Sequence, residues 1–194
     1  MTSLHSLCVF CGASVGADPG HREAASRLGQ LMADAGVSLV FGGGHIGMMG
    51  VLADAVLRGG GRVLGVIPEH LVRVEMPQRE ISELIVVDSM HTRKRRMFDM
   101  AQAFCVLPGG LGTLDETFEI LTWKQLRLHG KPVIVANLNG YWTPWLKLIE
   151  AVVEGGFAHE EVARLFTVVE TIEEVLPTVA AELNDAVLGR PQLF

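Results

Sequence analysis

The stretch VSLVFGGGHIGMMG, residues 37–50, decides the fold of this chain. It begins with a short apolar run of strand length, continues through a glycine-rich turn, and then enters a segment with the composition of a helix. A strand that enters a helix through glycines is the first half of a β-α-β unit, in which crossover helices join parallel strands. This stretch therefore predicts an α/β protein with a parallel sheet.

The same alternation continues on both sides of this unit. Helix-like segments separate strand-like runs, which lie near residues 4–11, 37–41, 63–67, 84–87, 104–107, 132–136 and 166. We expect a loop or flap over residues 69–83, and a helix capped by Thr143 with Pro144 in its first position. Residues 1–194 are predicted to form one doubly wound, Rossmann-like domain with a mainly parallel sheet of about seven strands flanked by helices.

The composition restricts the partners. Apolar residues make up 49% of the 194 residues, which suits a parallel sheet covered on both faces. The apolar runs are shorter than the roughly 20 residues of a membrane span, and no signal peptide is visible, so we expect a cytoplasmic protein without a membrane partner. The net charge of −6, without a long basic tract, argues against nucleic acid as a partner.

The cysteines suggest a metal or redox site only at first sight. Cys8 and Cys11 form a C-x-x-C pattern, which zinc sites and redox sites share. In the predicted strand, however, residues three apart point to opposite faces of the sheet, so the two thiols do not converge. With Cys105 in another predicted strand, we expect three buried, reduced thiols.

Two glycine turns follow predicted strands at the edge of the sheet where such folds bind ligands. A glycine turn that enters a helix offers backbone N–H groups and the positive end of the helix to a phosphate. Residues 42–47 fit G-x-G-x-x-G, which is a weak signal because tight turns also need glycine for steric reasons. Residues 108–113, PGGLGT, open directly onto a helix and are the stronger phosphate candidate.

Two charged residues near these turns have alternative interpretations. Thr113 to Glu116 fit a helix capping box, or Glu116 is a catalytic carboxylate, whose charge beside a phosphate requires a cation or a cationic transition state. Arg93 shares a helical stripe with Met90 and Met97, so it lies on a largely apolar face and needs an anionic partner there. It forms either a structural ion pair or part of an active site.

Three motifs in the chain resemble those of the LOG family. Gly42–Gly50 resembles G-G-G-x-x-G-L-M-G, Met90–Lys94 resembles M-H-x-R-K, and Pro108–Glu116 resembles P-G-G-x-G-T-x-x-E. Met48 stands where leucine is usual, and residues 69–83 are hard to align. The resemblance extends from the turn at residues 11–14 to about residue 180.

The resemblance implies an enzyme that hydrolyses the N-glycosidic bond of cytokinin riboside 5′-monophosphates or AMP. The products are the free base and ribose 5-phosphate, no metal or cofactor is needed, and homodimers are typical. Arg93 and Glu116 are the implied catalytic residues. The residues expected to contact the substrate are Ser14, Gly43, Gly44, Glu80, Met90, Lys94, Gly109, Gly110, Gly112, Thr113 and Thr122.

Three other functions compete with this interpretation. A nicotinamide-dependent oxidoreductase is suggested by G-x-G-x-x-G and by Glu69, about 25 residues after Gly44, but it leaves the second turn unexplained. A non-catalytic carrier of a nucleotide or of molybdenum cofactor would not need Arg93 and Glu116. A lysine decarboxylase, an older label for this family, needs a lysine that forms a Schiff base. No persuasive site surrounds any of the four lysines, Lys94, Lys124, Lys131 and Lys147.

Overall fold

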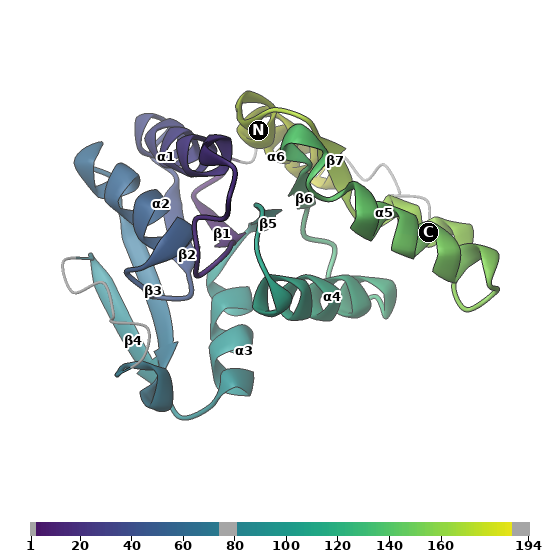
Figure 1. Ribbon diagram of the computed structural model, residues 1–194, viewed down its shortest axis with the longest axis horizontal. Helices are drawn as coiled ribbons and strands as arrows, with labels where there is room; N and C mark the ends of the chain where they lie inside the picture. The colour runs from purple at the N-terminus through teal and green to yellow at the C-terminus, as the bar shows by residue number, and fades with distance from the viewer. Residues whose placement is uncertain (1–2, 74–80, 188–194) are drawn as a thin grey trace.

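The computed structural model describes residues 3–73 and 81–187, which contain a parallel sheet of seven strands (Figure 1). The strands are β1 (Ser6–Phe10), β2 (Ser38–Phe41), β3 (Val63–Pro68), β4 (Glu83–Val87), β5 (Ala103–Val106), β6 (Val133–Ala136) and β7 (Thr167–Val169). The α-helices are α1 (Pro19–Asp34), α2 (Gly47–Arg58), α3 (Met90–Met100), α4 (Leu111–Gln125), α5 (Thr143–Glu154) and α6 (Val175–Val187). The predicted α/β class and the predicted parallel sheet are confirmed.

The strand order, β4-β3-β2-β1-β5-β6-β7, reverses next to β1. From β1 the chain runs outward through β2 and β3 to β4, then returns so that β5 pairs with the other side of β1, with Val9 opposite Cys105. In a doubly wound sheet such a reversal leaves a crevice beyond the carboxyl ends of the two central strands. The fold therefore places a binding crevice after β1 and β5.

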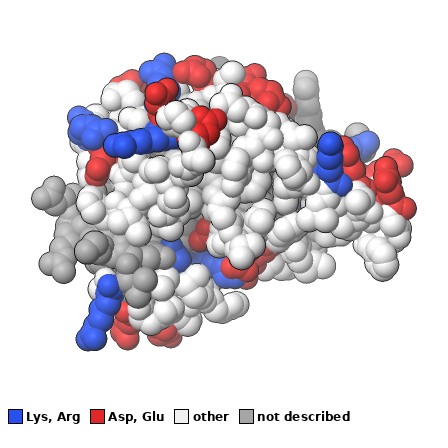
Figure 2. Space-filling model, viewed as in Figure 1, with Lys and Arg blue, Asp and Glu red and all other residues white. Residues whose placement is uncertain are grey.

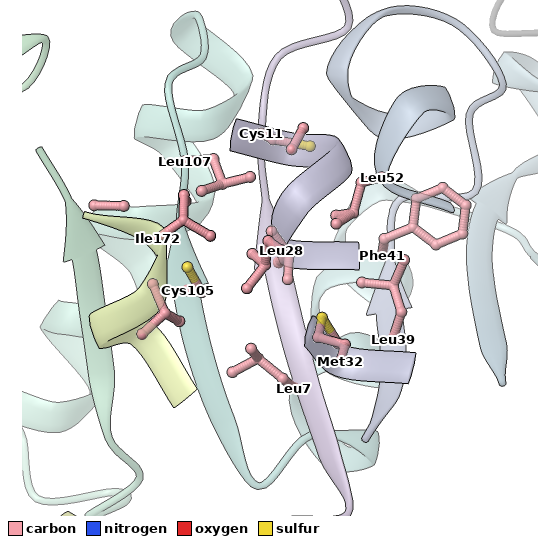
Figure 3. Packing of buried hydrophobic residues seen from close by; sticks show 14 of the residues in the cluster. Leu7, Cys11, Leu28, Met32, Leu39, Phe41, Leu52, Cys105, Leu107 and Ile172 are labelled. Atoms are coloured by element: carbon pink, nitrogen blue, oxygen red, sulfur yellow. The ribbon is translucent and has the colours of Figure 1, made fainter. Parts of the chain in front are cut away.

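Helices cover both faces of the sheet, and each face has its own apolar core. Side chains of α1, α2 and α6 pack on one face, and those of α3, α4 and α5 pack on the other. Figure 3 shows part of the first core, where Leu28 and Met32 of α1 lie against Leu7 of β1 and Leu39 of β2. Strands buried on both faces explain the long apolar runs of the sequence.

The cysteines lie as predicted. Cys8 belongs to the core beneath α3 and α4, whereas Cys11 and Cys105 belong to the core beneath α1 and α2, as Figure 3 shows for the latter two. All three thiols are free and buried. Burial raises the pKa of each thiol, that of Cys105 to about 12, so these sulfurs stay protonated at neutral pH.

Some local predictions need correction. Thr143 is not the cap of α5 but its first residue; Trp142 precedes it without a side-chain capping bond, and the hydroxyl of Thr143 accepts from the amide of Asn137 at 3.5 Å instead. Within the predicted loop, residues 69–71 form the 3-10 helix η1 (Glu69–Leu71), and β4 already begins at Glu83. In the described part of the chain, no helix is long and apolar enough to cross a membrane.

Candidate active site

A cavity of about 580 Å³ opens beyond the carboxyl ends of β1 and β5. The loop after β1 contributes residues 11–16, the turn after β5 contributes residues 108–113, and α3 contributes Met90 and Arg93. The two loops are joined directly, because the N–H of Gly12 donates to the carbonyl oxygen of Pro108 at 3.1 Å. The cavity therefore occupies the crevice at which the strand order reverses.

The second glycine turn leads the chain from β5 into α4 at the wall of this cavity. Gly110 precedes the helix with an extended backbone, and no side chain caps the helix. At Gly110 and Gly112 a side chain would meet no atom within 4 Å, whereas at Gly109 it would overlap Thr113. The start of α4 therefore combines open space with backbone N–H groups and the positive end of the helix dipole, which suits an anion.

This early start of α4 excludes the capping box as an explanation of Glu116. The helix begins at Leu111, so Thr113 lies within its first turn and is buried rather than standing before it as a cap. Gly110 has the extended backbone of an N-cap residue, so the helix begins after Gly110 and not after Thr113. Glu116 instead lines the cavity.

Arg93 is held rigidly in the same cavity, with only 5% of its surface exposed. Its Nε donates to the carbonyl oxygen of Val66 at 3.1 Å, and its Nη2 donates to that of Gly42 at 2.9 Å. Met90 and Arg93 lie on the same face of α3, as predicted, with Nη1 of Arg93 3.7 Å from the sulfur of Met90. Carbonyl oxygens within β3 and in the turn after β2 thus fix the guanidinium.

Arg93 and Glu116 act electrostatically on the same buried group, the thiol of Cys8. Burial is the main cause of the raised pKa of Cys8, the charge of Glu116 raises this pKa further, and the charge of Arg93 opposes both effects. Since Cys8 lies in β1, one positive and one negative side chain both lie within electrostatic range of this central strand. The cavity thus brings together the two residues that the motifs singled out.

The first glycine turn has a different role from the second. The N–H of Met48, in the first turn of α2, donates to the carbonyl oxygen of Gly12 at 3.0 Å, so the protein itself satisfies one of the N–H groups at this helix end. Gly47 has a φ of +67°, and a side chain there would overlap the backbone of Ala13. Packing therefore explains the glycine at position 47, in keeping with the structural role that the weak motif left open.

Five of the predicted substrate contacts lie elsewhere or cannot be placed. Gly43 and Gly44 are buried but do not line the cavity, and the hydroxyl of Thr122 donates to the carbonyl oxygen of Phe118 on an exposed part of α4. Glu80 lies outside the described residues. The expected contacts that do line the cavity are Ser14, Met90, Gly109, Gly110, Gly112 and Thr113.

Lys94, the fifth of these residues, is not part of the cavity lining and joins α3 to α4. Its Nζ lies 3.1 Å from Oδ2 of Asp115 and 3.3 Å from Oε2 of Glu119. Partial burial opposes the positive charge, but hydrogen bonds to both carboxylates outweigh it and raise the pKa of Lys94. Figure 2 shows basic and acidic side chains together in a hollow where α3 meets the start of α4.

His21 and Tyr141 also line the cavity, although no motif pointed to them. The hydroxyl of Tyr141 donates to the carbonyl oxygen of Gly109 at 2.7 Å, and its ring meets that of His21 edge to face, with centroids 5.1 Å apart. The sequence signal for Tyr141 was its position, since it shortly follows the predicted strand at residues 132–136. It is also the single tyrosine of the chain.

The chain is similar to proteins of known name. A family model described as "Possible lysine decarboxylase" matches residues 49–179. Cytokinin riboside 5′-monophosphate phosphoribohydrolase LOG of Oryza sativa subsp. japonica is 41% identical over 170 residues, which cover 88% of this chain and 70% of that protein. The phosphoribohydrolase LOG7 of Arabidopsis thaliana is 42% identical, with 88% of this chain and 78% of that protein covered.

A solved structure shares the fold at lower sequence identity. The molybdenum cofactor carrier protein of Chlamydomonas reinhardtii superposes with a TM-score of 0.71 and 20% identity, covering 93% of this chain and 99% of that one. At this identity the likeness concerns the fold alone. The family model and the identity to the plant proteins agree with the three motifs, and the chain belongs to the LOG family.

Proposed function

We propose that this chain hydrolyses the N-glycosidic bond of nucleoside 5′-monophosphates, AMP and its N6-modified forms included, and releases the free base and ribose 5-phosphate. The observation that carries the proposal is that Arg93 and Glu116 line the same cavity as the open glycine turn at the start of α4. The names of the rice and Arabidopsis relatives, both phosphoribohydrolases, support this reaction.

The glycine turn at residues 109–113 is the proposed phosphate site. Its backbone N–H groups and the helix dipole favour an anion, and Gly110 and Gly112 leave room for one. A phosphate held there fixes the ribose relative to Glu116. Binding energy from a non-reacting group is thereby used to align the bond that breaks.

Glu116 is the proposed catalytic carboxylate. When the bond between C1′ and the base nitrogen breaks, its electron pair leaves with the base and positive charge develops on the ribose ring. A fixed carboxylate stabilises this charge more strongly in the transition state than in the ground state. Glu116 also orients or deprotonates the water whose oxygen bonds to C1′, while the departing base nitrogen takes up a proton.

Arg93 is the proposed partner of Glu116. Its guanidinium is held by the carbonyl oxygens of Val66 and Gly42, so it does not need to be ordered when the substrate binds. A fixed positive charge in the cavity keeps a carboxylate ionised and contacts the polar groups of the nucleotide. Both effects require the rigid placement that the structure gives this side chain.

The base is expected to occupy the apolar part of the cavity. Met48, Met49, Met90 and Val15 are among the apolar residues of the lining. Methionine side chains are flexible and polarizable, so they adapt to ligands of varied shape. This lining supports a substrate range that includes purines with an apolar N6 substituent.

The named alternatives fit the cavity less well. In the described part of the chain no lysine lines it, so an amine for a Schiff base is missing there; Lys131, for example, donates to the carbonyl oxygen of Phe98 at 2.6 Å. Glu69, the expected ribose-binding acid of an oxidoreductase, lies in η1 and is not part of the lining. A carrier would have no use for a catalytic carboxylate.

We also propose that the protein acts as a homodimer through α4 and α5. The two helices meet where Phe118 lies 6.1 Å from Trp145, centroid to centroid, and Leu148 and Val152 extend this surface with further exposed apolar side chains. Exposed apolar patches commonly mark contacts between subunits. Sedimentation equilibrium should give twice the chain mass for the wild type and the chain mass for Leu148→Glu.

The reaction is tested by product analysis. The purified protein is incubated with AMP and with N6-isopentenyl-AMP, and free base and ribose 5-phosphate are measured by chromatography, with Arg93→Ala and Glu116→Gln beside the wild type. We expect both products in equal amounts from the wild type and neither from the variants. Binding of AMP without release of base would favour the carrier, and thermal stabilisation by NAD but not by AMP would favour the oxidoreductase.

A further inference from the structure

The charges that line the cavity do not balance a phosphate. Among the described residues of the lining, the ionisable side chains are Cys11, His21, Arg93, Glu116 and Tyr141. Burial raises the pKa of Cys11, which keeps its thiol neutral, and Arg93 and Glu116 carry opposite charges. Beside the backbone N–H groups of the glycine turn, a further donor or positive group would strengthen the binding of a dianionic phosphate, and among the described residues of the lining His21 is the remaining nitrogen-bearing ionisable side chain.

The strand order places His21 and Arg93 on opposite sides of the glycine turn at the start of α4. Along the sheet edge the carboxyl ends follow in the order β2, β1, β5 and β6. Arg93 donates a hydrogen bond to the carbonyl oxygen of Gly42, which follows β2. Tyr141 follows β6, and its ring contacts the ring of His21. The start of α4 after β5 thus has Arg93 on one side and the pair of His21 and Tyr141 on the other.

The imidazole of His21 is held in place rather than exposed to solvent. Its side chain is 8% exposed, and Nε2 lies 3.8 Å from Oδ2 of Asp18. The amide of Asn139 donates to Asp18 at 3.0 Å, and so does the N–H of Gly20 at 2.8 Å. These hydrogen bonds lower the pKa of Asp18, so an ionised carboxylate lies beside the ring of His21.

We propose that His21 binds the 5′-phosphate of the substrate, opposite Arg93 across the start of α4, and that Tyr141 positions its ring. The inference rests on the proposed function, since it names a further contact in the same site. The loops after β1, β5 and β6 converge on this contact, because Tyr141 is bonded to Gly109 and Asn139 to Asp18. His21 would thereby distinguish a nucleotide from a nucleoside.

The test compares ligands that differ only in the phosphate. AMP and adenosine are titrated by calorimetry into the Glu116→Gln protein, with and without His21→Gln or Tyr141→Phe. His5→Gln is the matched control, because His5 is exposed and precedes β1 at the opposite edge of the sheet. We expect His21→Gln to weaken the binding of AMP about tenfold and that of adenosine less than about twofold. Tyr141→Phe should change both affinities in the same direction, and the control should change neither affinity.

Steady-state kinetics separate this inference from the proposed function. In the otherwise wild-type protein, His21→Gln should raise the KM for AMP about tenfold and change kcat less than about threefold. Equal weakening of AMP and adenosine, or unchanged AMP affinity, would overturn the role of His21 even if base release is observed. Absence of base release, with selective loss of AMP affinity in His21→Gln, would overturn the proposed reaction but not the phosphate contact. A protein that binds neither AMP nor ribose 5-phosphate would overturn both.

Discussion

Nη2 of Arg93 donates to the carbonyl oxygen of Gly42 at 2.9 Å, which ties the arginine of α3 to the turn after β2. The first glycine motif and the arginine motif are 51 residues apart in the sequence and meet at this bond. The turn after β2, together with the carbonyl oxygen of Val66 in β3, therefore sets the position of the guanidinium. Precise placement of such a group is what catalysis by electrostatic stabilisation requires.

The first prediction concerns Gly42→Ala. A Cβ at this position would overlap Nη2 of Arg93 and lie 3.3 Å from the sulfur of Met49, so the guanidinium must move. We expect kcat/KM for AMP to fall on the order of 100-fold, with a loss of about 1–3 kcal/mol in the free energy of unfolding from overpacking.

Gly130→Ala is the control for this substitution, because a Cβ there meets no atom within 4 Å. Kinetics and urea unfolding are measured for both variants. A Gly42→Ala enzyme with wild-type kcat/KM would show that the position of Arg93 does not limit the reaction.

The second prediction concerns Lys124, which is 2% exposed on α4. Burial lowers the pKa of this lysine, and attraction by Glu182 offsets only part of the effect. Below the folded-state pKa, Lys124 is charged in both states, but its charge is desolvated only in the native protein. This desolvation lowers the free energy of unfolding at neutral pH. The penalty disappears as the pH rises from the folded-state pKa toward the ordinary value of 10.5.

Lys124→Met should therefore unfold at higher urea than the wild type at pH 7, by on the order of 1 kcal/mol. This advantage should shrink as the pH approaches 10. Lys147→Met, at an exposed position of α5, is the control and should be neutral at every pH. A Lys124→Met protein that is less stable at pH 7 would mean that the buried ammonium contributes favourably to the fold.

The third prediction concerns the end of α4. Arg127 has a φ of 59° and follows the C-cap Leu126, while the N–H of Leu128 donates to the carbonyl oxygen of Trp123 at 2.9 Å. This is a Schellman ending, in which glycine normally takes the left-handed position. Arg127→Gly should raise the free energy of unfolding by about 0.5–1 kcal/mol.

Arg127→Ala separates backbone strain from the loss of the side chain, since alanine keeps the strain. Chemical denaturation of the three proteins gives the comparison. If the glycine variant is no more stable than the alanine variant, the left-handed backbone is not a source of strain.

The sequence predicted those features that are encoded locally. The apolar strands and glycine turns predicted the parallel sheet, and the spacing of Met90, Arg93 and Met97 predicted that Arg93 is buried. Both follow from periodicity within a single element. Two contacts of Arg93 were not predicted, because they are backbone carbonyl oxygens of β3 and of the turn after β2, which lie far from Arg93 in the sequence.

Features that depend on the neighbours of a loop were not predictable in this way. His21 and Tyr141 meet only because β1, β5 and β6 are adjacent in the sheet, and neither residue belongs to a motif. Likewise, the role of the first glycine turn depends on the bond between Met48 and Gly12, two segments far apart in the sequence. The order of the strands, rather than any local pattern, brings these residues together.

The most direct test of the account is the turnover of Glu116→Gln measured together with its affinity for AMP. Glutamine keeps the shape of the side chain and removes the charge that is proposed to stabilise the ribosyl cation. We predict that release of adenine falls by about 10³-fold while the Kd for AMP and the unfolding temperature stay close to those of the wild type. Wild-type turnover in this variant, or loss of activity only together with AMP binding or folding, would contradict the central role of Glu116.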